Sequence, residues 1–216
     1  MAIERENLEV HAWTVGPIMT NVYVVACRKT GEAVIIDAGA ESDQLVDKIE
    51  EKGWKLKEIW QTHAHIDHVA GLNEVRARSE APILMHAADQ PLYEMAVQQG
   101  AMFGFRIQPL PPVDQYVEEG QVVNVGELKA KVILLPGHSP GSVAFYFWEE
   151  GLFFGGDVLF AGSVGRVDLP GSSPVEMRRS LERVKELPDE TEVLCGHGPT
   201  TTIGQEKRLN PFLRGG

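Results

Sequence analysis

The sequence predicts an α/β fold in which two sheets pack face to face and helices cover their outer sides. Segments with the character of strands outnumber those with the character of helices, and they form two groups, each followed by helices. The chain has 216 residues, of which 43% are hydrophobic, so it is long enough to bury a large core. We therefore expect one domain that spans residues 1–216.

The first group opens with three strands that are rich in Val, Ile and Tyr and are separated by turn residues. They are predicted at Leu8–Val15, Thr20–Cys27 and Ala33–Asp37. A helix is expected over Ser42–Lys52, because Ser42 suits an N-cap and Gly53 ends the periodic pattern.

The pattern then alternates between strands and helices. A strand is predicted at Leu56–Thr62, a helix at Val69–Ser79, a short strand at Ala81–Met85 and a helix at Ala87–Gln99. Pro91 is tolerated because it lies near the start of the last helix.

The segment Ala101–Asp114 is apolar, but it contains one glycine and three prolines and is predicted to have no regular structure. Two interpretations remain open for it. It is either a hydrophobic flap packed on the core, or a wall or lid over the active site.

The second group again consists of strands followed by helices. Strands are predicted at Gln121–Val125, Lys129–Leu135, Ser142–Trp148, Gly151–Phe154 and Thr191–Leu194, and helices at Pro174–Leu187 and Ile203–Arg208.

The charge and the cysteine content limit the possible partners and location. The formal net charge is −11 with no cluster of Lys and Arg, which argues against a partner with a phosphate backbone. No apolar run approaches the roughly 20 residues that span a membrane, and residues 1–6 do not resemble a secretory signal or transit peptide. Cys27 and Cys195 provide no disulfide framework. We expect a cytoplasmic protein that binds neither nucleic acid nor membrane.

Residues 62–68 form a heptad, Thr-His-Ala-His-Ile-Asp-His, which brings four metal-binding side chains into six positions. In an extended segment, side chains two residues apart point the same way, so His63 and His65 are placed to bind one ion. Asp67 and His68 then turn toward a second ion beside it. Such crowding is unfavourable unless a cation gathers the imidazoles, but the heptad alone does not decide between one metal and two.

Three later residues each follow a strand that ends in a glycine turn. They are His138 in G-H-S-P-G-S, Asp157 in G-G-D and His197 in G-H-G-P. Glycine at such a position lets the backbone approach a site closely and directs the next side chain from the strand end. With the heptad, these residues complete a candidate set of seven ligands.

These motifs together resemble those of the metallo-β-lactamase superfamily. The wider context is similar to the short glyoxalase II-like, or hydroxyacylglutathione hydrolase-like, enzymes. The shared stretches are Asn21–Tyr23, Ile36–Gly39, Gly165–Pro170, Gly196–Thr200 and Glu206–Leu213. The resemblance covers essentially the whole chain and implies a four-layer αβ/βα sandwich.

The resemblance also implies roles for the seven residues. His63, His65 and His138 correspond to the ligands of a first metal, and Asp157 corresponds to a bridging carboxylate. The ligands of a second metal correspond to Asp67, His68 and His197.

Neighbouring residues are expected to support this site. Asp37 ends an apolar strand, and it either orients a ligating histidine from behind or caps a turn above Gly39. Arg166 and Asp168 are expected to pair beneath the site. Cys195 is expected to be a buried apolar residue and not a thiolate ligand.

The chemistry of this site favours thioester hydrolysis. Two divalent metals about 3.5–4 Å apart share one water and lower its pKa toward neutrality. With Asp67, Asp157 and the bridging hydroxide counted, the site keeps a small positive charge that suits an anionic substrate and an oxyanion. A thiolate leaves without a general acid, whereas an amine does not. Asp67 is expected to orient the hydroxide.

The resemblance names the expected substrate as S-lactoylglutathione or a related hydroxyacyl thioester. The expected cofactors are two divalent metal ions, zinc first, with iron or manganese also compatible with His and carboxylate ligands. The alternatives are a mononuclear Fe(II) persulfide dioxygenase, and a lactonase or β-lactamase on the same fold. The sequence does not assign the oligomeric state.

One departure from full-length glyoxalase II concerns substrate binding. That family carries a helical C-terminal extension that helps bind glutathione, whereas 19 residues follow His197 here. We expect the extension to be lacking and the glutathione site to be absent or rebuilt. Candidate replacements are the apolar 101–114 segment and the basic residues Lys207, Arg208 and Arg214, although solvated surface charge is the default for the latter.

Overall fold

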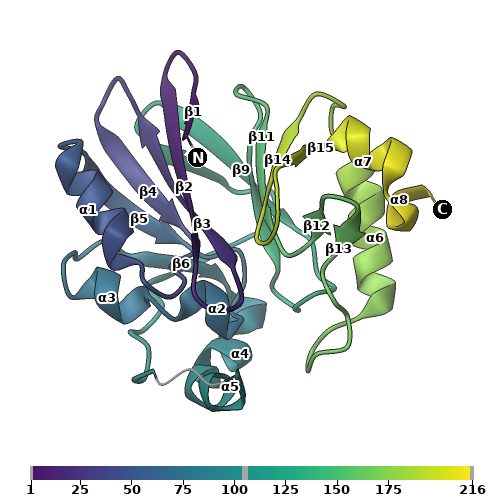
Figure 1. Ribbon diagram of the computed structural model, residues 1–216, viewed down its shortest axis with the longest axis horizontal. Coiled ribbons are helices and arrows are strands. Elements are labelled where there is room, and N and C mark those ends of the chain that lie inside the picture. The colour runs from purple at the N-terminus through teal and green to yellow at the C-terminus, as the bar shows by residue number, and fades with distance from the viewer. Residues whose placement is uncertain (1, 104–106, 215–216) are drawn as a thin grey trace.

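The computed structural model, which describes residues 2–103 and 107–214, consists of two sheets packed face to face with helices outside them (Figure 1). The first sheet has seven strands and the second has six, and a two-stranded ribbon accompanies the second. The predicted fold class is confirmed. Within these residues, no helix has the length and apolar character needed to cross a lipid bilayer.

The first sheet is antiparallel on one side and parallel on the other, because β1 to β4 pair antiparallel whereas β4 to β7 pair parallel. In spatial order its strands are β1 (Ala2–Glu4), β2 (Leu8–Val15), β3 (Thr20–Cys27), β4 (Glu32–Ile36), β5 (Lys55–Trp60), β6 (Ile83–His86) and β7 (Gln115–Val117). Parallel strands end at one common edge, so the residues that follow β4, β5 and β6 meet there.

Short helices cover the outer face of the first sheet. They are α1 (Asp43–Glu51), α2 (Ile66–Val69), α3 (Leu72–Arg76), η1 (Ala87–Asp89), α4 (Gln90–Glu94) and α5 (Ala96–Phe103). Leu45, Val46 and Ile49 of α1 are buried at helical spacing against the sheet, which explains why this segment forms an amphipathic helix.

The second sheet is antiparallel except for one central pair, β11 and β14, which run parallel. In spatial order its strands are β15 (Thr201–Thr202), β14 (Glu192–Cys195), β11 (Leu152–Gly156), β10 (Val143–Phe147), β9 (Leu128–Leu134) and β8 (Val122–Val125). The ribbon is β12 (Leu159–Phe160) with β13 (Ser163–Val164), and the helices are α6 (Pro174–Lys185), α7 (Ile203–Leu209) and α8 (Pro211–Arg214).

Aromatic residues fill the layer between the two sheets. Trp60 of β5 lies 4.9 Å from Phe145 and 6.1 Å from Phe147, measured between ring centroids, and all three side chains are fully buried. Full burial of such a side chain contributes about 1.5–3 kcal/mol to folding. This layer fixes the two sheets against each other and therefore fixes the loops at their common edge.

The predicted helix at Val69–Ser79 is wrong in its start and its continuity. The first helical turn, α2, begins at Ile66, so Asp67 and His68 are helical residues, and α3 follows after a break at Gly71. The amide of Gly71 donates to the carbonyl of Ala38, and a Cβ there would overlap the carbonyl of Gly39. The chain breaks because it must lie directly against the loop that follows β4.

The expectation that residues 101–114 have no regular structure is partly wrong, since α5 continues to Phe103. Gly104, Phe105 and Arg106 lie outside the described residues. Residues 107–114 are irregular, and Ile107, Leu110 and Val113 pack against the core beneath the first sheet. The described part of this segment therefore packs as a flap.

The sequence analysis missed the shortest elements, namely β1, β7, β12, β13, β15 and α8. Each has two to four residues, too few for a hydrophobic period to repeat.

Candidate metal centre

All seven candidate ligands meet at the edge where the strands of both sheets end. Their ligand atoms form three overlapping groups in which all members lie within 4.8 Å of one another. These groups are His63, His65 and His138; His63, His68 and Asp157; and Asp67, His68 and His197. We call the first group the first cluster and the third group the second cluster.

Parallel pairing explains why residues so distant in sequence converge. Asp37 follows β4 and the heptad follows β5, so the two lie side by side. In the second sheet, Asp157 follows β11 and His197 follows β14, and these strands are also parallel neighbours. The fold places each motif at the carboxyl end of a strand on the same edge.

Two glycines at these strand ends are required by close approach. A Cβ on Gly156, whose φ is +49°, would overlap the Thr62 hydroxyl, and a Cβ on Gly196 would overlap the Asp157 carboxylate. Larger residues would therefore separate the two sheets where their loops meet.

Four of the imidazoles have one ring nitrogen held by a neighbour that fixes the tautomer. The Nδ1 partners are Thr62 Oγ1 for His63 at 3.0 Å, Asp37 Oδ2 for His68 at 2.9 Å, the Arg166 carbonyl for His138 at 2.9 Å and the Met19 carbonyl for His197 at 3.2 Å. Carbonyls and carboxylates only accept, and the Thr62 hydroxyl donates its own proton to Asp37, so each Nδ1 is the donor. The Nε2 atoms are left for a cation.

Asp37 is buried next to the candidate ligands and accepts three hydrogen bonds from the heptad. Its carboxylate accepts from the backbone amide of Thr62 at 2.8 Å, from the Thr62 hydroxyl at 2.8 Å and from His68. Its φ of +59° is unusual for a residue other than glycine, and this strained backbone turns the side chain toward the heptad.

Asp89 is a second buried carboxylate that accepts three hydrogen bonds, and the sequence analysis missed it. It accepts from the Ala64 amide at 2.9 Å, the Ser139 hydroxyl at 2.8 Å and the Gly141 amide at 2.5 Å. It thus joins the loop of His65 to the loop of His138. The only available signal was an acidic residue inside a predicted helix, which is usually an exposed one.

Three buried polar atoms of the centre have no hydrogen-bond partner among the described residues. They are His63 Nε2, His68 Nε2 and Asp157 Oδ1. Each such atom costs roughly 1–3 kcal/mol if nothing compensates its desolvation. These three unpartnered atoms are all possible metal ligands and lie within 4.8 Å of one another, so the residues present suit bound divalent cations.

Two histidines of the first cluster have lowered pKa values, which suits them to bind a cation. Burial, reinforced by neighbouring histidines, holds the pKa of His63 well below its ordinary value. Burial and the nearby His138 lower the pKa of His65 to about 3. Both imidazoles are therefore neutral at pH 7, which is the form that binds metal.

The second cluster is anionic by comparison. Burial opposes charge on His68, but Asp67, Asp157 and Asp37 outweigh it and hold the pKa of His68 well above its ordinary value. Burial likewise opposes charge on His197, but hydrogen bonds with Asp157 and Asp67 raise its pKa to about 10. Without a metal, protons therefore supply the positive charge that this cluster requires.

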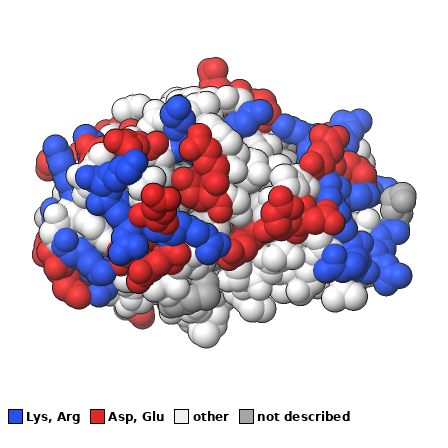
Figure 2. Space-filling model, turned by 90° about the horizontal axis from the view of Figure 1, so that it is seen from above, with Lys and Arg blue, Asp and Glu red and all other residues white. Residues whose placement is uncertain are grey.

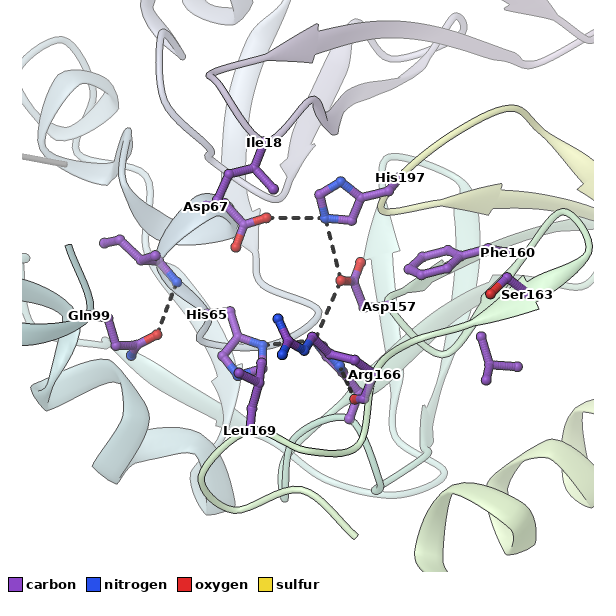
Figure 3. Close-up of a pocket in the computed structure, with 13 residues that line it drawn as sticks. Ile18, His65, Asp67, Gln99, Asp157, Phe160, Ser163, Arg166, Leu169 and His197 are labelled. Carbon is purple, nitrogen blue, oxygen red and sulfur yellow. Dashed lines mark hydrogen bonds and ion pairs between the residues drawn. The ribbon is translucent and has the colours of Figure 1, made fainter. Parts of the chain in front are cut away.

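A cleft of about 340 Å³ opens over both clusters, a size that suits a small ligand (Figure 3). Besides ligand residues, it is lined by Ile18, Ile66, Gln99, Phe160, Ser163, Val164, Arg166 and Leu169. Gln99 of α5 contacts the heptad loop through the Ile66 amide at 3.3 Å.

Arg166 lies at the exposed rim of the cleft and not beneath the site. Its Nε and Nη2 atoms donate to the two carboxylate oxygens of Asp168 at 2.7 and 2.8 Å. The expected pairing is therefore present, but its place differs from the expectation. Lys207 instead pairs with Asp189 away from the cleft.

Cys195 lies two residues before His197 but is buried, and its Sγ atom is directed at the Val193 carbonyl at 3.8 Å. Burial raises the pKa of the Cys195 thiol to about 12, so at neutral pH it is not a thiolate.

The sequence matches a known family model and is similar to several curated proteins. The sequence model described as "Metallo-beta-lactamase superfamily" matches residues 15–197. The hydroxyacylglutathione hydrolase GloC of Haemophilus influenzae is 37% identical over 190 residues, which cover 84% of this chain and 87% of that protein. The probable metallo-hydrolase YqgX of Bacillus subtilis is 36% identical over 204 residues, covering 93% of this chain and 95% of that one.

Several solved structures are similar to this chain in both fold and sequence. The di-iron-bound form of TTHA1623 is 43% identical and covers 94% of this chain and 100% of its own, with a TM-score of 0.86. The B3 metallo-β-lactamase BLEG-1 is 35% identical and covers 95% of this chain and 100% of its own, with a TM-score of 0.89. ETHE1 from Myxococcus xanthus is 27% identical and covers 94% of this chain and 83% of its own, with a TM-score of 0.78.

Proposed function

The chain belongs to the metallo-β-lactamase superfamily, and from that premise we propose that it is a dinuclear metal-dependent thioesterase. The proposed substrate is S-lactoylglutathione or a related hydroxyacyl thioester. The observation that carries this proposal is the pair of adjacent ligand clusters at the floor of one cleft.

In this proposal, His63, His65 and His138 hold one metal, and Asp67, His68 and His197 hold the other. Asp157 would serve both metals, and its position supports this: Oδ1 lies 3.4 Å from His68 Nε2, and Oδ2 lies 3.4 Å from both His138 Nε2 and His197 Nε2.

When bound, two such metals supply a nucleophile at neutral pH and Lewis acidity for the carbonyl oxygen. The residues of the chain do the rest. Asp67, which lines the cleft, would accept a hydrogen bond from the attacking water and orient it toward the thioester carbonyl. The apolar wall of Ile18, Phe160 and Val164 limits access of bulk water to the reacting atoms.

The leaving group distinguishes a thioester from an amide. The cleft residues that are not ligand candidates have apolar, amide, hydroxyl or guanidinium side chains. None of these types is an effective proton donor at pH 7. A thiolate departs without a proton, because thiol pKa values lie near 8.5, whereas an amine does not. This chemistry favours thioester hydrolysis, and the hydroxyacylglutathione hydrolase relative supports it.

The surface supports a small-molecule substrate in preference to a nucleic acid. Figure 2 shows acidic and basic side chains interspersed over most of one face, with basic side chains gathered at one end of it. The formal net charge of −11 further disfavours a polyanionic partner. The metal pair is proposed to be zinc, and the di-iron form of TTHA1623 supports iron as the other candidate.

The proposal is tested by incubating purified protein with S-lactoylglutathione and assaying free thiol before and after chelation, with metals counted per chain. We expect chelator-sensitive thiol release and about two metals per chain. The ETHE1 likeness motivates the first competing assay, oxygen uptake with glutathione persulfide. Oxygen uptake with one iron per chain and no thiol release would refute the thioesterase, as would turnover of lactones or β-lactams alone.

A further inference from the structure

The hairpin between β2 and β3 reaches the edge of the cleft and ends in a buried polar residue. Ile18 of this turn lines the cleft, and Thr20, the first residue of β3, is only 1% exposed. The Thr20 hydroxyl donates a hydrogen bond to Asp67 Oδ2 at 2.8 Å. None of the motifs identified in the sequence includes this threonine.

The same short segment also holds His197. The carbonyl of Met19 accepts from His197 Nδ1 at 3.2 Å, and Thr20 forms an isolated antiparallel β-bridge with His197. The amide of Asn21 donates to the Gly196 carbonyl at 2.7 Å. One stretch of three residues thus contacts both exposed members of the second cluster.

The backbone of the turn makes this double contact possible. Met19 has a φ of +62°, in the left-handed region that residues other than glycine seldom adopt. This strained residue lets its carbonyl face His197 while the next side chain faces Asp67. A left-handed conformation at a residue other than glycine indicates that the surrounding site constrains the backbone there.

The Asp67 carboxylate needs an anchor because its terminal torsion is soft. Rotation about the Cβ–Cγ bond of aspartate has a broad preference, so the side chain alone does not fix the plane of the carboxylate. Thr20 is β-branched in a strand, where its own χ1 is restricted, so its hydroxyl is a rigid donor. The bond to Oδ2 therefore fixes the plane.

Fixing the plane assigns different surroundings to the two oxygens. Oδ2 lies 3.1 Å from His197 Nε2 and 3.3 Å from His68 Nε2, among the atoms of the second cluster. Figure 3 shows the other oxygen of Asp67 directed away from His197, toward the middle of the cleft.

We propose that Thr20 is a positioning residue that fixes Asp67 for two tasks, with Oδ2 holding the second metal and Oδ1 free to orient the attacking water. This proposal rests on the proposed function for its second task but not for its first. The first task predicts a defect in metal binding that is measurable without any substrate.

The test compares Thr20→Val, which removes only the donor, with Thr20→Ser, which keeps it. Zinc is titrated into the metal-free protein by calorimetry. In Thr20→Val we expect the affinity for one of the two zinc ions to fall about 10–100-fold, as for other groups that orient metal ligands, while the other is unchanged. Thr20→Ser should restore most of this affinity.

Thr191 supplies a matched control for the loss of a buried threonine hydroxyl. Thr191 is also 1% exposed, but its Oγ1 has no hydrogen-bond partner among the described residues. Thr191→Val should therefore bind both zinc ions as the native chain does. Thermal unfolding of the metal-free proteins shows whether Thr20→Val is folded, and we expect its midpoint to match that of Thr191→Val within a few degrees.

For the second task, thioester hydrolysis is measured at saturating zinc. We expect Thr20→Val to lower kcat with little change in KM, because the substrate contacts are retained. Native affinity for both zinc ions in Thr20→Val, or an equal loss of both, would overturn the proposal. If Thr20→Val loses affinity for only one zinc ion and the native protein hydrolyses no thioester, the first task is upheld and only the proposed function is refuted.

Discussion

The two ligand clusters lie side by side, but they differ in burial and in what holds them. In the first cluster, His63, His65 and His138 are all buried. In the second cluster, His68 is fully buried, whereas the side chains of His197 and Asp67 are 23% and 13% exposed.

Their supports differ in the same way. The first cluster is held by buried groups, including Thr62 after β5 and Asp89 at the end of η1. The second is held partly by Asp37, which also accepts from Thr62, and partly by an edge hairpin through Met19 and Thr20. The difference is that His63 and His65 of the first cluster are neutral at pH 7, whereas the second cluster is more exposed and must lose protons before it binds a metal.

The largest effect is expected where the clusters meet. Asp157→Asn keeps the shape but removes the charge that faces both clusters, so thioester hydrolysis should fall by about 1,000-fold or more, corresponding to several kcal/mol of lost stabilisation. Initial rates at saturating zinc measure this. Asp189→Asn, which alters an exposed carboxylate paired with Lys207, is the control and should retain activity. A small effect at Asp157 would mean that the clusters act independently.

The next effect concerns pH and separates the clusters. At pH 7 the metal-free second cluster carries protons on His68 and on His197, whose pKa is about 10, and both protons must leave when metal binds. Affinity for the second metal should therefore fall as pH decreases, by about 100-fold per pH unit for two protons. The first cluster should respond less, since the pKa of His65 is about 3.

Calorimetry in two buffers of different ionisation heat counts the protons released. The variants His65→Ala and His197→Ala, each of which damages one cluster, assign the two binding events. Equal proton release by both events would contradict the proposed difference.

A smaller effect is expected from Asp37→Asn. The amide is close in size but cannot match the three hydrogen bonds that the carboxylate accepts, so His68 loses its fixed tautomer. We expect metal affinity at the second cluster to fall roughly 10–100-fold. Competition with a chromophoric chelator measures it, and an unchanged second-metal affinity would show that Asp37 serves folding alone.

The last effect is expected on stability and not on metal binding, from Asp89→Asn. In either orientation of the Asn side chain, its NH2 group replaces an oxygen that accepts from the backbone amide of Ala64 or of Gly141, so at least one buried amide loses its partner. Urea unfolding of the metal-free protein should show a loss of about 1–3 kcal/mol. Affinity for the second metal should not change; if it did, the two clusters would share one support.

The sequence predicted the layers of the fold and the convergence of seven side chains because both follow from repeated local patterns. Strand periodicity identified the long strands, and each ligand candidate stood beside a glycine turn at a strand end. Short elements such as β7 and β15 carried too few residues to show a period.

The supports of the clusters were harder to predict because they depend on contacts between distant segments. Asp89 lies inside a helical pattern, and only the packing of two loops turns it into a buried hub. Thr20 had the character of an ordinary strand residue, since its role depends on Asp67, which is 47 positions away. The helix start at Ile66 was missed because the heptad masks the apolar period.

The position of the centre between the two sheets has a consequence for the lifetime of the protein. Four of the seven candidate ligands follow a strand of the first sheet, and three follow strands of the second sheet. Bound metal would therefore link the two sheets. Free metal at a hundredfold excess over its Kd adds about 2.7 kcal/mol to the free energy of unfolding. The supply of metal in the cell would then govern how long each copy of the protein escapes degradation, independently of its catalytic activity.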